Sequence, residues 1–571
     1  MEEIKINTEN VYSELGTTNR TVRNIKKSLF FSLKEKYGFE GKEQTHELLK
    51  IHGLDDAKFD FVNFVNTLIN GNLSDTSIDS NSNKNEKTIE GVQQEAIAPV
   101  KKLVGYDYLY RKMKELYGKK EAKRLSGEMY DLSLGLADSI SVLRPYCFAL
   151  DASKLVTVGR PFGQLHSKPC KRVDSYIASL CETIHQMSNH CSGALAIGSL
   201  FLDIAHLLLF KEKVDLRDLK TNKKIRKRLE NEFQSLVHSV NHLSRSTSES
   251  SFTNVSIFDR IKLRMFIQEM SWYFPYEELP IDKPNIEKEE DLNLFYENYI
   301  IDYIIELQNI FLDFFDKGDP TKNGAPIRFP ILTLNISKTI KEGKETIDDL
   351  KFLRDVCKRE IYRYNIFTSE GTKICSCCRL VNNIDMLQYA AQSNSFGAGS
   401  SISLGSHRVC TINFMRIALE AETKENIKEE FFILLEKRIE STIKILNAHR
   451  ELLKDLIAKN LQPFFGYGWL NLNRMFSTIG IIGIYEAAKL LKEKDIGGDI
   501  ESEILIFLNE KVKALQEYYN ASEEKEYFIN GINYPEHKFL LIKNVNSNKI
   551  KFIQITKIKE YDTSAWEVFQ E

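Results

Sequence analysis

The sequence predicts an α/β fold with mostly parallel strands, for which a closed barrel or a doubly wound sheet would fit equally well. Two observations carry this prediction. Long amphipathic helical patterns alternate with short apolar segments, and the segments FPILTLNIS, HRVCTINFM and SIFDR have the length and composition of buried strands. Strands of parallel sheets are covered by helices on both faces, so they read as continuous apolar runs.

The helices are expected where apolar residues recur at helical spacing: 106–126, 175–210, 223–240, 292–315 and 427–461. Most of these segments carry charged residues on one face, as surface helices do. The second segment contains the small residues CSGALAIG, which we expect to allow close helix packing.

Composition divides the chain into four regions. Residues 1–69 have an amphipathic helical pattern, and residues 70–95 form an Asn- and Ser-rich connecting loop. Residues 96–520 make up the densely structured body. The tail, 521–571, alternates apolar and polar residues around an Asn-Ser-Asn turn, which predicts an atypical β-rich appendage with a hairpin.

Charge and hydropathy exclude several classes of function. The chain of 571 residues has 78 Lys and Arg against 80 Asp and Glu, so it has no basic surface for nucleic acid or anionic membranes. The start, MEEIKINTEN, is not a secretory signal, and the apolar runs are too short or too interrupted to span a bilayer. We expect a cytoplasmic protein that binds neither nucleic acid nor membrane.

The cysteines indicate a reducing compartment, because nine of them are spread over a long chain, several in apolar surroundings. Cys375, Cys377 and Cys378 are clustered in ICSCCRL. A zinc site would need a second pair near this C-x-x-C, and only Cys410 follows. Buried thiols are the second alternative, and a redox or radical loop is the interpretation we favour.

A second candidate site lies in FSTIGIIGIYEAAKLL. Ser477 and Thr478 precede a glycine-spaced run that continues as a helix, and Gly480 would allow an anion to approach the backbone closely. The segment therefore fits a phosphate-binding loop, although an ordinary capped core helix fits it as well. Asn335, alone in its apolar strand, has the pattern of a satisfied core amide.

Taken in order, these segments resemble the class III, anaerobic ribonucleoside-triphosphate reductases of the glycyl-radical enzyme superfamily. The resemblance extends over residues 70–491. It begins with the Asn-rich NGNLSDTSIDSNSNK and continues with GEMYDLSLGL, YCFALD, FTNVSIFD, FPILTLNIS, CCRL, GSHRVCTINFMRIALEAE and STIGIIGIYEA. Each motif is weak alone, and their shared order makes the case.

The resemblance implies a ten-stranded α/β barrel over 96–520, incomplete at its carboxyl end, and the reduction of NTPs to dNTPs. In this family a thiyl radical on a finger loop, matched by Cys378, abstracts the 3′ hydrogen of the ribose. A cysteine on an early strand, matched by Cys147, supplies an electron and a proton. The residues matched to the phosphate loop are Ser477, Thr478, Ile479 and Gly480, and Asn413 and Asn254 are matched to polar residues of the barrel lumen.

Two departures from the family concern the reductant. Tyr130 stands before Asp131 where many members have a histidine, and Ser406 stands where formate-using members have an asparagine. A thioredoxin- or glutaredoxin-like dithiol protein is therefore favoured over formate, with Cys377 as the exchanging thiol and Cys375 as its alternative.

The family's carboxyl end, a zinc-bound four-cysteine module followed by Arg-Val-x-Gly-Tyr, has no match in these residues, and no cysteine follows Cys410. We therefore expect no metal site and no stably bound cofactor here, and no activity from the chain alone. A second chain would supply the glycyl radical and zinc. A split gene, an interrupting intron or intein, and a degenerate relative all fit this expectation.

The resemblance also implies partners. These are nucleoside triphosphates, an S-adenosylmethionine radical activase, ATP and dNTP allosteric effectors, and a second copy in a homodimer. An amino-terminal ATP cone is not evident in 1–69. The alternative functions are a catalytically inactive nucleotide-binding protein and a glycyl-radical lyase, for which the phosphate loop and CCRL are the wrong context.

Overall fold

The computed structural model describes most of the body of the chain. The described residues are 88–162, 165–245, 249–269, 273–282, 288–359, 364–371, 373–375, 381–383, 405–494, 498–523, 539–544 and 552–555, with Asn70, Ile361 and Ile496. The predicted helical region 1–69, most of the 70–95 loop, Cys377 and Cys378 lie outside them.

A central 11-stranded sheet organises the described part of the chain. Its first half is parallel: β2 (Cys147–Leu150), β5 (Leu195–Ile197), β8 (Thr253–Phe258), β9 (Ile331–Lys341) and β11 (Tyr364–Ser369). The second half is also parallel: β14 (Gly405–Asn413), β15 (Met475–Ile482) and β16 (Phe539–Asn544). The two halves meet where β2 pairs antiparallel with β14.

The remaining strands of this sheet pair antiparallel at its margins: β1 (Leu134–Leu136), β10 (Lys344–Ile347) and β17 (Phe552–Ile555). Three small hairpins lie outside it: β3 (Arg160–Phe162) with β4 (Leu165–Ser167), β6 (Leu243–Arg245) with β7 (Glu249–Ser250), and β12 (Lys373–Cys375) with β13 (Val381–Asn383). The structure confirms a mixed α/β fold with a mostly parallel sheet. Among the described strands no pairing closes the sheet into a ring, so the ten-stranded barrel stays a prediction.

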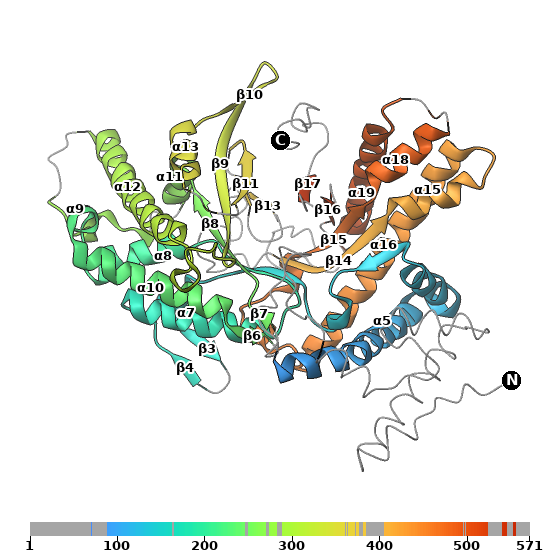
Figure 1. Cartoon of the computed structure of the whole chain (residues 1–571), viewed down its shortest axis with the longest axis horizontal. Coiled ribbons are helices and arrows are strands. Elements are labelled where there is room, and N and C mark those ends of the chain that lie inside the picture. Colours follow the sequence, from blue (N-terminus) through green and yellow to red (C-terminus); the bar gives the residue numbers. More distant parts are fainter. Residues whose placement is uncertain are drawn as a thin grey trace, which may run out of the picture.

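Helices flank both halves of the sheet (Figure 1). On the side of the first half are α6 (Lys154–Thr157), α7 (Val173–Ser188), α8 (Leu200–His206), α9 (Leu216–Thr221), α10 (Lys223–Asn241), α11 (Arg260–Glu269), α12 (Glu289–Asp316) and α13 (Leu350–Cys357). On the side of the second half are α5 (Ile89–Tyr130), α15 (Phe414–Glu422), α16 (Ile427–Ala458), α18 (Ile484–Glu493) and α19 (Ile500–Glu523). The short α17 (Pro463–Gly466) follows α16. None of the described helices is both long and apolar enough to cross a membrane.

The predicted long helix 175–210 is wrong in its middle. Helix α7 ends at Ser188, and CSGALAIG forms the loop and strand β5 rather than a helix-packing surface. A Cβ on Gly193 would lie 2.3 Å from the Sγ atom of Cys147. The small residues therefore allow β5 to approach β2 closely.

The segment 476–491 also differs from its prediction. Ser477, Thr478, Ile479 and Gly480 lie within strand β15, and α18 begins only after Gly483, whose φ of 78° makes it a left-handed turn. The hydroxyl groups are therefore not at a helix amino terminus.

The hairpin predicted in the tail is confirmed, because β16 and β17 pair antiparallel with Leu541 opposite Ile555. Strand β16 also pairs with β15 in parallel, so this part of the tail extends the main sheet. At the other end, α5 begins at Ile89, inside the region interpreted as a connecting loop.

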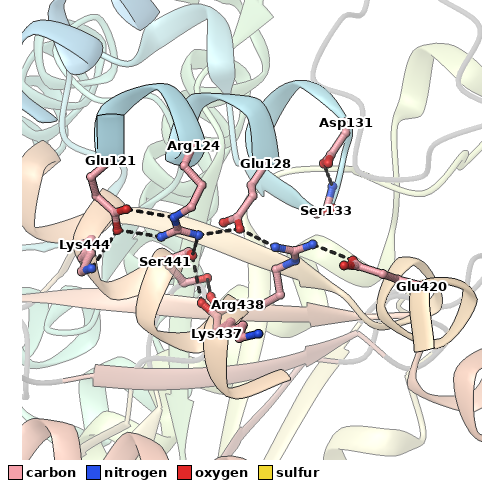
Figure 2. Close-up of polar contacts among 11 residues, drawn as sticks. Glu121, Arg124, Glu128, Asp131, Ser133, Glu420, Lys437, Arg438, Ser441 and Lys444 are labelled. Atoms are coloured by element: carbon pink, nitrogen blue, oxygen red, sulfur yellow. Dashed lines mark hydrogen bonds and ion pairs between the residues drawn. The ribbon is translucent and has the colours of Figure 1, made fainter. Parts of the chain in front are cut away.

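A charged network fixes α5 against α16 and α15 (Figure 2). Glu128, the first acidic residue of the GEMYD motif, is buried and pairs with Arg124 at 2.7 Å and with Arg438 of α16. Arg438 also pairs with Glu420 at 2.8 Å. Hydrogen bonding to Arg124 holds the pKa of Glu121 down at about 2. The motif therefore joins helices on the outside of the sheet.

Candidate active site

One face of β2 and β5 carries a small cluster of its own, formed by Cys147, Ala149, Ala194 and Ala196. Alternate residues of a strand face the same way, and the register places Ala149 beside Ala196. The opposite face of these strands carries Phe148, Leu150, Leu195 and Ile197, which belong to the main core. The first face is therefore lined by one thiol and small side chains.

Cys147 is fully buried on this face, and its Sγ atom accepts a hydrogen bond from the Ala194 N–H at 3.3 Å. Its register partner across the antiparallel junction is Ser406. Two residues predicted for the site from distant parts of the sequence are thus neighbours.

The face continues over β8 and β9 with polar side chains. Asn254 is in register with Ala196, and its Nδ2 atom donates to Thr333 Oγ1 at 2.7 Å. The Oδ1 atom of Asn254 is buried and accepts no hydrogen bond from the described residues. Asn254 therefore lies on the same face of the sheet as Ala196, with a buried acceptor oxygen to which none of the described residues donates.

On β14 and β15 the face carries Ser406 and Thr478, whose hydroxyl oxygens are 2.7 Å apart. Gly480 lies against Thr411, since a Cβ on Gly480 would be 2.3 Å from Thr411 Oγ1. Ser477 points to the other side of β15, where its hydroxyl is 2.8 Å from His407 Nε2. Because a strand alternates its faces, the four predicted phosphate-loop residues do not present one surface.

Asn413, predicted as a polar residue of the barrel lumen, caps a helix in the structure. It caps α15, where its Oδ1 accepts from the Arg416 N–H at 3.3 Å and its Nδ2 donates to Leu132 O at 3.1 Å. Its amide is used to start a helix and to hold the turn before β1.

Sequence reasoning missed a buried polar cluster behind β14, made of His407, Arg408 and His449. Arg408 is buried and donates to the carbonyl oxygens of Ala137 and Ser141, each at 2.9 Å. Burial lowers the pKa of Arg408 to about 10 and holds the pKa of His449 well below its usual value. The signal was the polar pair His407 and Arg408 inside the buried strand GSHRVCTIN.

The geometry of this cluster allows a chain of neutral hydrogen bonds. His449 Nε2 is 2.7 Å from the Val142 oxygen, and the Nδ1 atoms of the two histidines are 3.0 Å apart. If His449 donates to Val142, its Nδ1 accepts from His407, whose Nε2 then accepts from the Ser477 hydroxyl. Each ring nitrogen has one partner in this assignment, and the protonated His449 Nε2 then does not accept from Arg408 Nε, which lies 3.3 Å away.

Cys375 is the member of the cysteine cluster that lies within the described residues, and it belongs to the hairpin β12–β13. Cys375, the last residue of β12, pairs with Val381 of β13, and residues 376–380 join the strands along the chain. Cys375 is buried, and both backbone polar groups of Cys375 are bound by the Asn335 amide of β9.

Cys410 lies on the helix side of β14, where burial raises the pKa of its thiol to about 12. Within the described ranges, no group of three or more His, Cys, Asp or Glu residues is arranged to hold a metal ion.

The thiol of Cys147 is buried on a face of small and polar side chains, which makes this face of the sheet the candidate active site. The family model of the anaerobic ribonucleoside-triphosphate reductases matches residues 80–530. The chain belongs to this family and is an oxidoreductase that reduces ribonucleoside triphosphates.

Solved structures agree with this assignment. The chain is similar to the anaerobic ribonucleotide reductase from Thermotoga maritima with citrate in the active site, with 22% identity, a TM-score of 0.64, and coverage of 92% of this chain and 83% of that one. The same enzyme in complex with dATP and CTP gives 23% identity and a TM-score of 0.62, covering 91% and 75%. These similarities show the fold, and no curated protein matches the chain.

Proposed function

We propose that this chain reduces ribonucleoside triphosphates with a thiyl radical at Cys378 and a reducing thiol at Cys147. The observation that carries the proposal is the position of Cys147, buried on a face shared with Ser406, Thr478 and Asn254. The hairpin leading to Cys378 is bound to the same face by Asn335. Two sulfurs on opposite sides of a ribose are what the chemistry requires.

In the proposed reaction the Cys378 radical takes the 3′ hydrogen, forming S–H and a substrate radical. Cys147 and the exchanging thiol each supply one proton and one electron, so that the 2′ hydroxyl leaves as water and a hydrogen replaces it on the 2′ carbon. Cys378 then returns the hydrogen to the 3′ carbon. A dithiol oxidised to a disulfide provides the two electrons and two protons overall. A face closed to water protects the radicals.

For the substrate, Thr478 and Gly480 are the proposed phosphate-side contacts, because they share the face of Cys147. Asn254 offers its open oxygen to a ribose hydroxyl or an exocyclic amine. Ser477 and Ile479 are proposed to support the substrate site through the backbone of β15. Asn413 is proposed to support it by starting α15.

A glycyl radical supplies the oxidising equivalent that converts the Cys378 thiol into its radical. We propose that it comes from a segment outside these residues, together with the zinc module, and that an S-adenosylmethionine activase generates it. No proposed step passes through zinc.

By analogy with the dATP and CTP complex of the Thermotoga enzyme, dNTPs and ATP are proposed as effectors of a homodimer. A thioredoxin- or glutaredoxin-like protein is the proposed reductant, with Cys377 as the exchanging thiol. Full turnover of Cys377→Ser with a dithiol reductant would remove that role.

The test is anaerobic assembly of this chain with the glycyl-radical polypeptide, the activase and S-adenosylmethionine. We expect a glycyl-radical EPR doublet and formation of dCTP from CTP. Cys378→Ser should keep the doublet and abolish dCTP formation. Turnover by this variant, or a doublet without turnover by the parent chain, would contradict the proposal.

A further inference from the structure

We propose that Asn335 is a positioning residue for the thiyl loop, holding the strand that leads to Cys378. This inference rests on the proposed role of Cys378 and names a second residue, Asn335, that the proposed reaction needs. The sequence pattern alone assigned Asn335 to the core as an ordinary satisfied amide.

The contact is a two-point clamp. The Asn335 Oδ1 atom accepts from the Cys375 N–H at 2.6 Å, and its Nδ2 atom donates to the Cys375 carbonyl oxygen at 3.1 Å. Two hydrogen bonds from one planar amide fix both the position and the orientation of the peptide backbone. Both residues are buried, so water does not compete for these groups.

The clamp belongs to the face that carries the site. Asn335 is two residues beyond Thr333 on β9, so both side chains leave the strand on the same side, where Thr333 binds Asn254. Asn335 pairs in register with Phe258 and Phe367, in the interior of the parallel half-sheet. Strand β9, in the interior of the sheet, thus holds β12 on the side of the sheet where Thr333 binds Asn254.

A second contact fixes the chain just before the hairpin. The buried Lys262 of α11 donates from Nζ to the Ser369 oxygen at 3.2 Å, to the Ser369 hydroxyl at 3.0 Å, and to the Gly371 oxygen. The turn from β11 into β12 is therefore held at one end by Lys262 and at the other by Asn335.

The clamp matters because hydrogen abstraction depends steeply on distance. A displacement of about 1 Å in a reacting group costs roughly 10²-fold in rate. Cys378 lies three positions after Cys375 in the sequence, so displacement of the Cys375 backbone moves the point from which the chain continues to Cys378.

The chain offers a matched control in Gln308 of α12. Its amide makes the same two-point contact with the backbone of Phe258, with both bonds at 2.9 Å, and it is equally buried. Gln308 lies on the helix side of β8. Gln308→Met and Asn335→Leu therefore remove equivalent hydrogen bonds on opposite sides of the sheet.

The test compares both variants in the anaerobic assembly. We expect Asn335→Leu to lower kcat by about 10²-fold, with the KM for CTP within about threefold and the glycyl-radical doublet unchanged. Gln308→Met should keep kcat within about threefold of the parent value. Equal losses of kcat in the two variants would overturn the proposal.

A second readout needs no turnover. We expect Asn335→Leu to raise the rate of Cys378 alkylation by iodoacetamide about tenfold, measured by peptide mass spectrometry, with Cys147 and Cys410 unaffected. Unchanged Cys378 reactivity, or an equal rise at all three thiols, would refute the positioning role. If the parent assembly makes no dCTP, the proposed function fails, and this readout still decides whether Asn335 positions the loop.

Discussion

The two halves of the sheet, which meet at β2 and β14, carry similar small and polar side chains on the face of the candidate site. They differ in the buried side chains on the opposite face, which the helices cover. Behind β8 and β9 the buried side chains are apolar, including Val255, Ile257, Leu332 and Leu334. Behind β14 and β15 they include His407, Arg408 and Ser477. Apolar packing tolerates small shifts, whereas directional hydrogen bonds fix register.

This difference indicates which strands have their positions fixed by directional hydrogen bonds. Arg408 binds carbonyl groups in the segment that runs into β2, the strand of Cys147. A charged side chain on β14 thus fixes the strand opposite to it, at the junction of the two halves. In the first half, Asn335 fixes a neighbouring backbone segment in the same way, through its hydrogen bonds to Cys375.

The largest effect is expected from Arg408→Met, which removes every one of these hydrogen bonds and leaves buried carbonyl groups unpaired. Its free energy of unfolding should fall by about 3 to 5 kcal/mol, as when a buried charged partner is removed. Denaturant unfolding measures it, with Leu334→Met as the control behind the apolar half, for which a loss below about 1.5 kcal/mol is expected. A comparable loss of unfolding free energy in both variants would contradict the claim that hydrogen bonds fix the second half more strictly than apolar packing fixes the first.

The apolar side of the first half also holds buried polar side chains, and one of them is Asp203 of α8. Burial raises the pKa of this carboxyl to about 6 although four hydroxyl groups donate to it, those of Ser153, Ser199, Tyr176 and Tyr273. Because the folded pKa lies above the usual 3.8, the protonated group stabilises the fold at low pH, and this stability is lost as pH rises through 6.

Between pH 4 and pH 7 the parent chain should therefore lose about 2 kcal/mol of unfolding free energy relative to Asp203→Asn. Urea titrations of both chains across this range give the difference. A difference that does not vary with pH would show that Asp203 keeps an ordinary pKa.

The smallest effect compares neighbours on opposite faces of β15. Thr478→Val should raise the KM for CTP by about tenfold, the cost of one lost polar contact of about 1 kcal/mol or slightly more. Ser477→Ala should leave the KM unchanged and lower stability by about 1 kcal/mol, because His407 loses a partner. The reverse pattern would place the substrate on the helix side.

The sequence was sufficient for the class of fold, for the strands β8, β9 and β14, and for the hairpin in the tail, because apolar runs and turn residues are local signals. It failed at CSGALAIG, where small residues allow strand approach as readily as helix packing. It also failed for Ser477, since a phosphate loop and a polar strand residue look alike until pairing partners are known.

The site could be assembled from sequence only by resemblance. Cys147 and Ser406 are far apart in the chain, and only the antiparallel junction makes them partners. The parts of Asn335 and Arg408 were not predictable, because each depends on the backbone groups that the fold brings within reach.

The most direct test of the central claim is dCTP formation by Cys147→Ser in the anaerobic assembly, with Cys410→Ser as the control for a buried thiol on the other face of the sheet. The account predicts that Cys147→Ser forms the glycyl-radical doublet but no dCTP, while Cys410→Ser keeps its turnover. Normal dCTP formation by Cys147→Ser would contradict the assignment of this face as the active site.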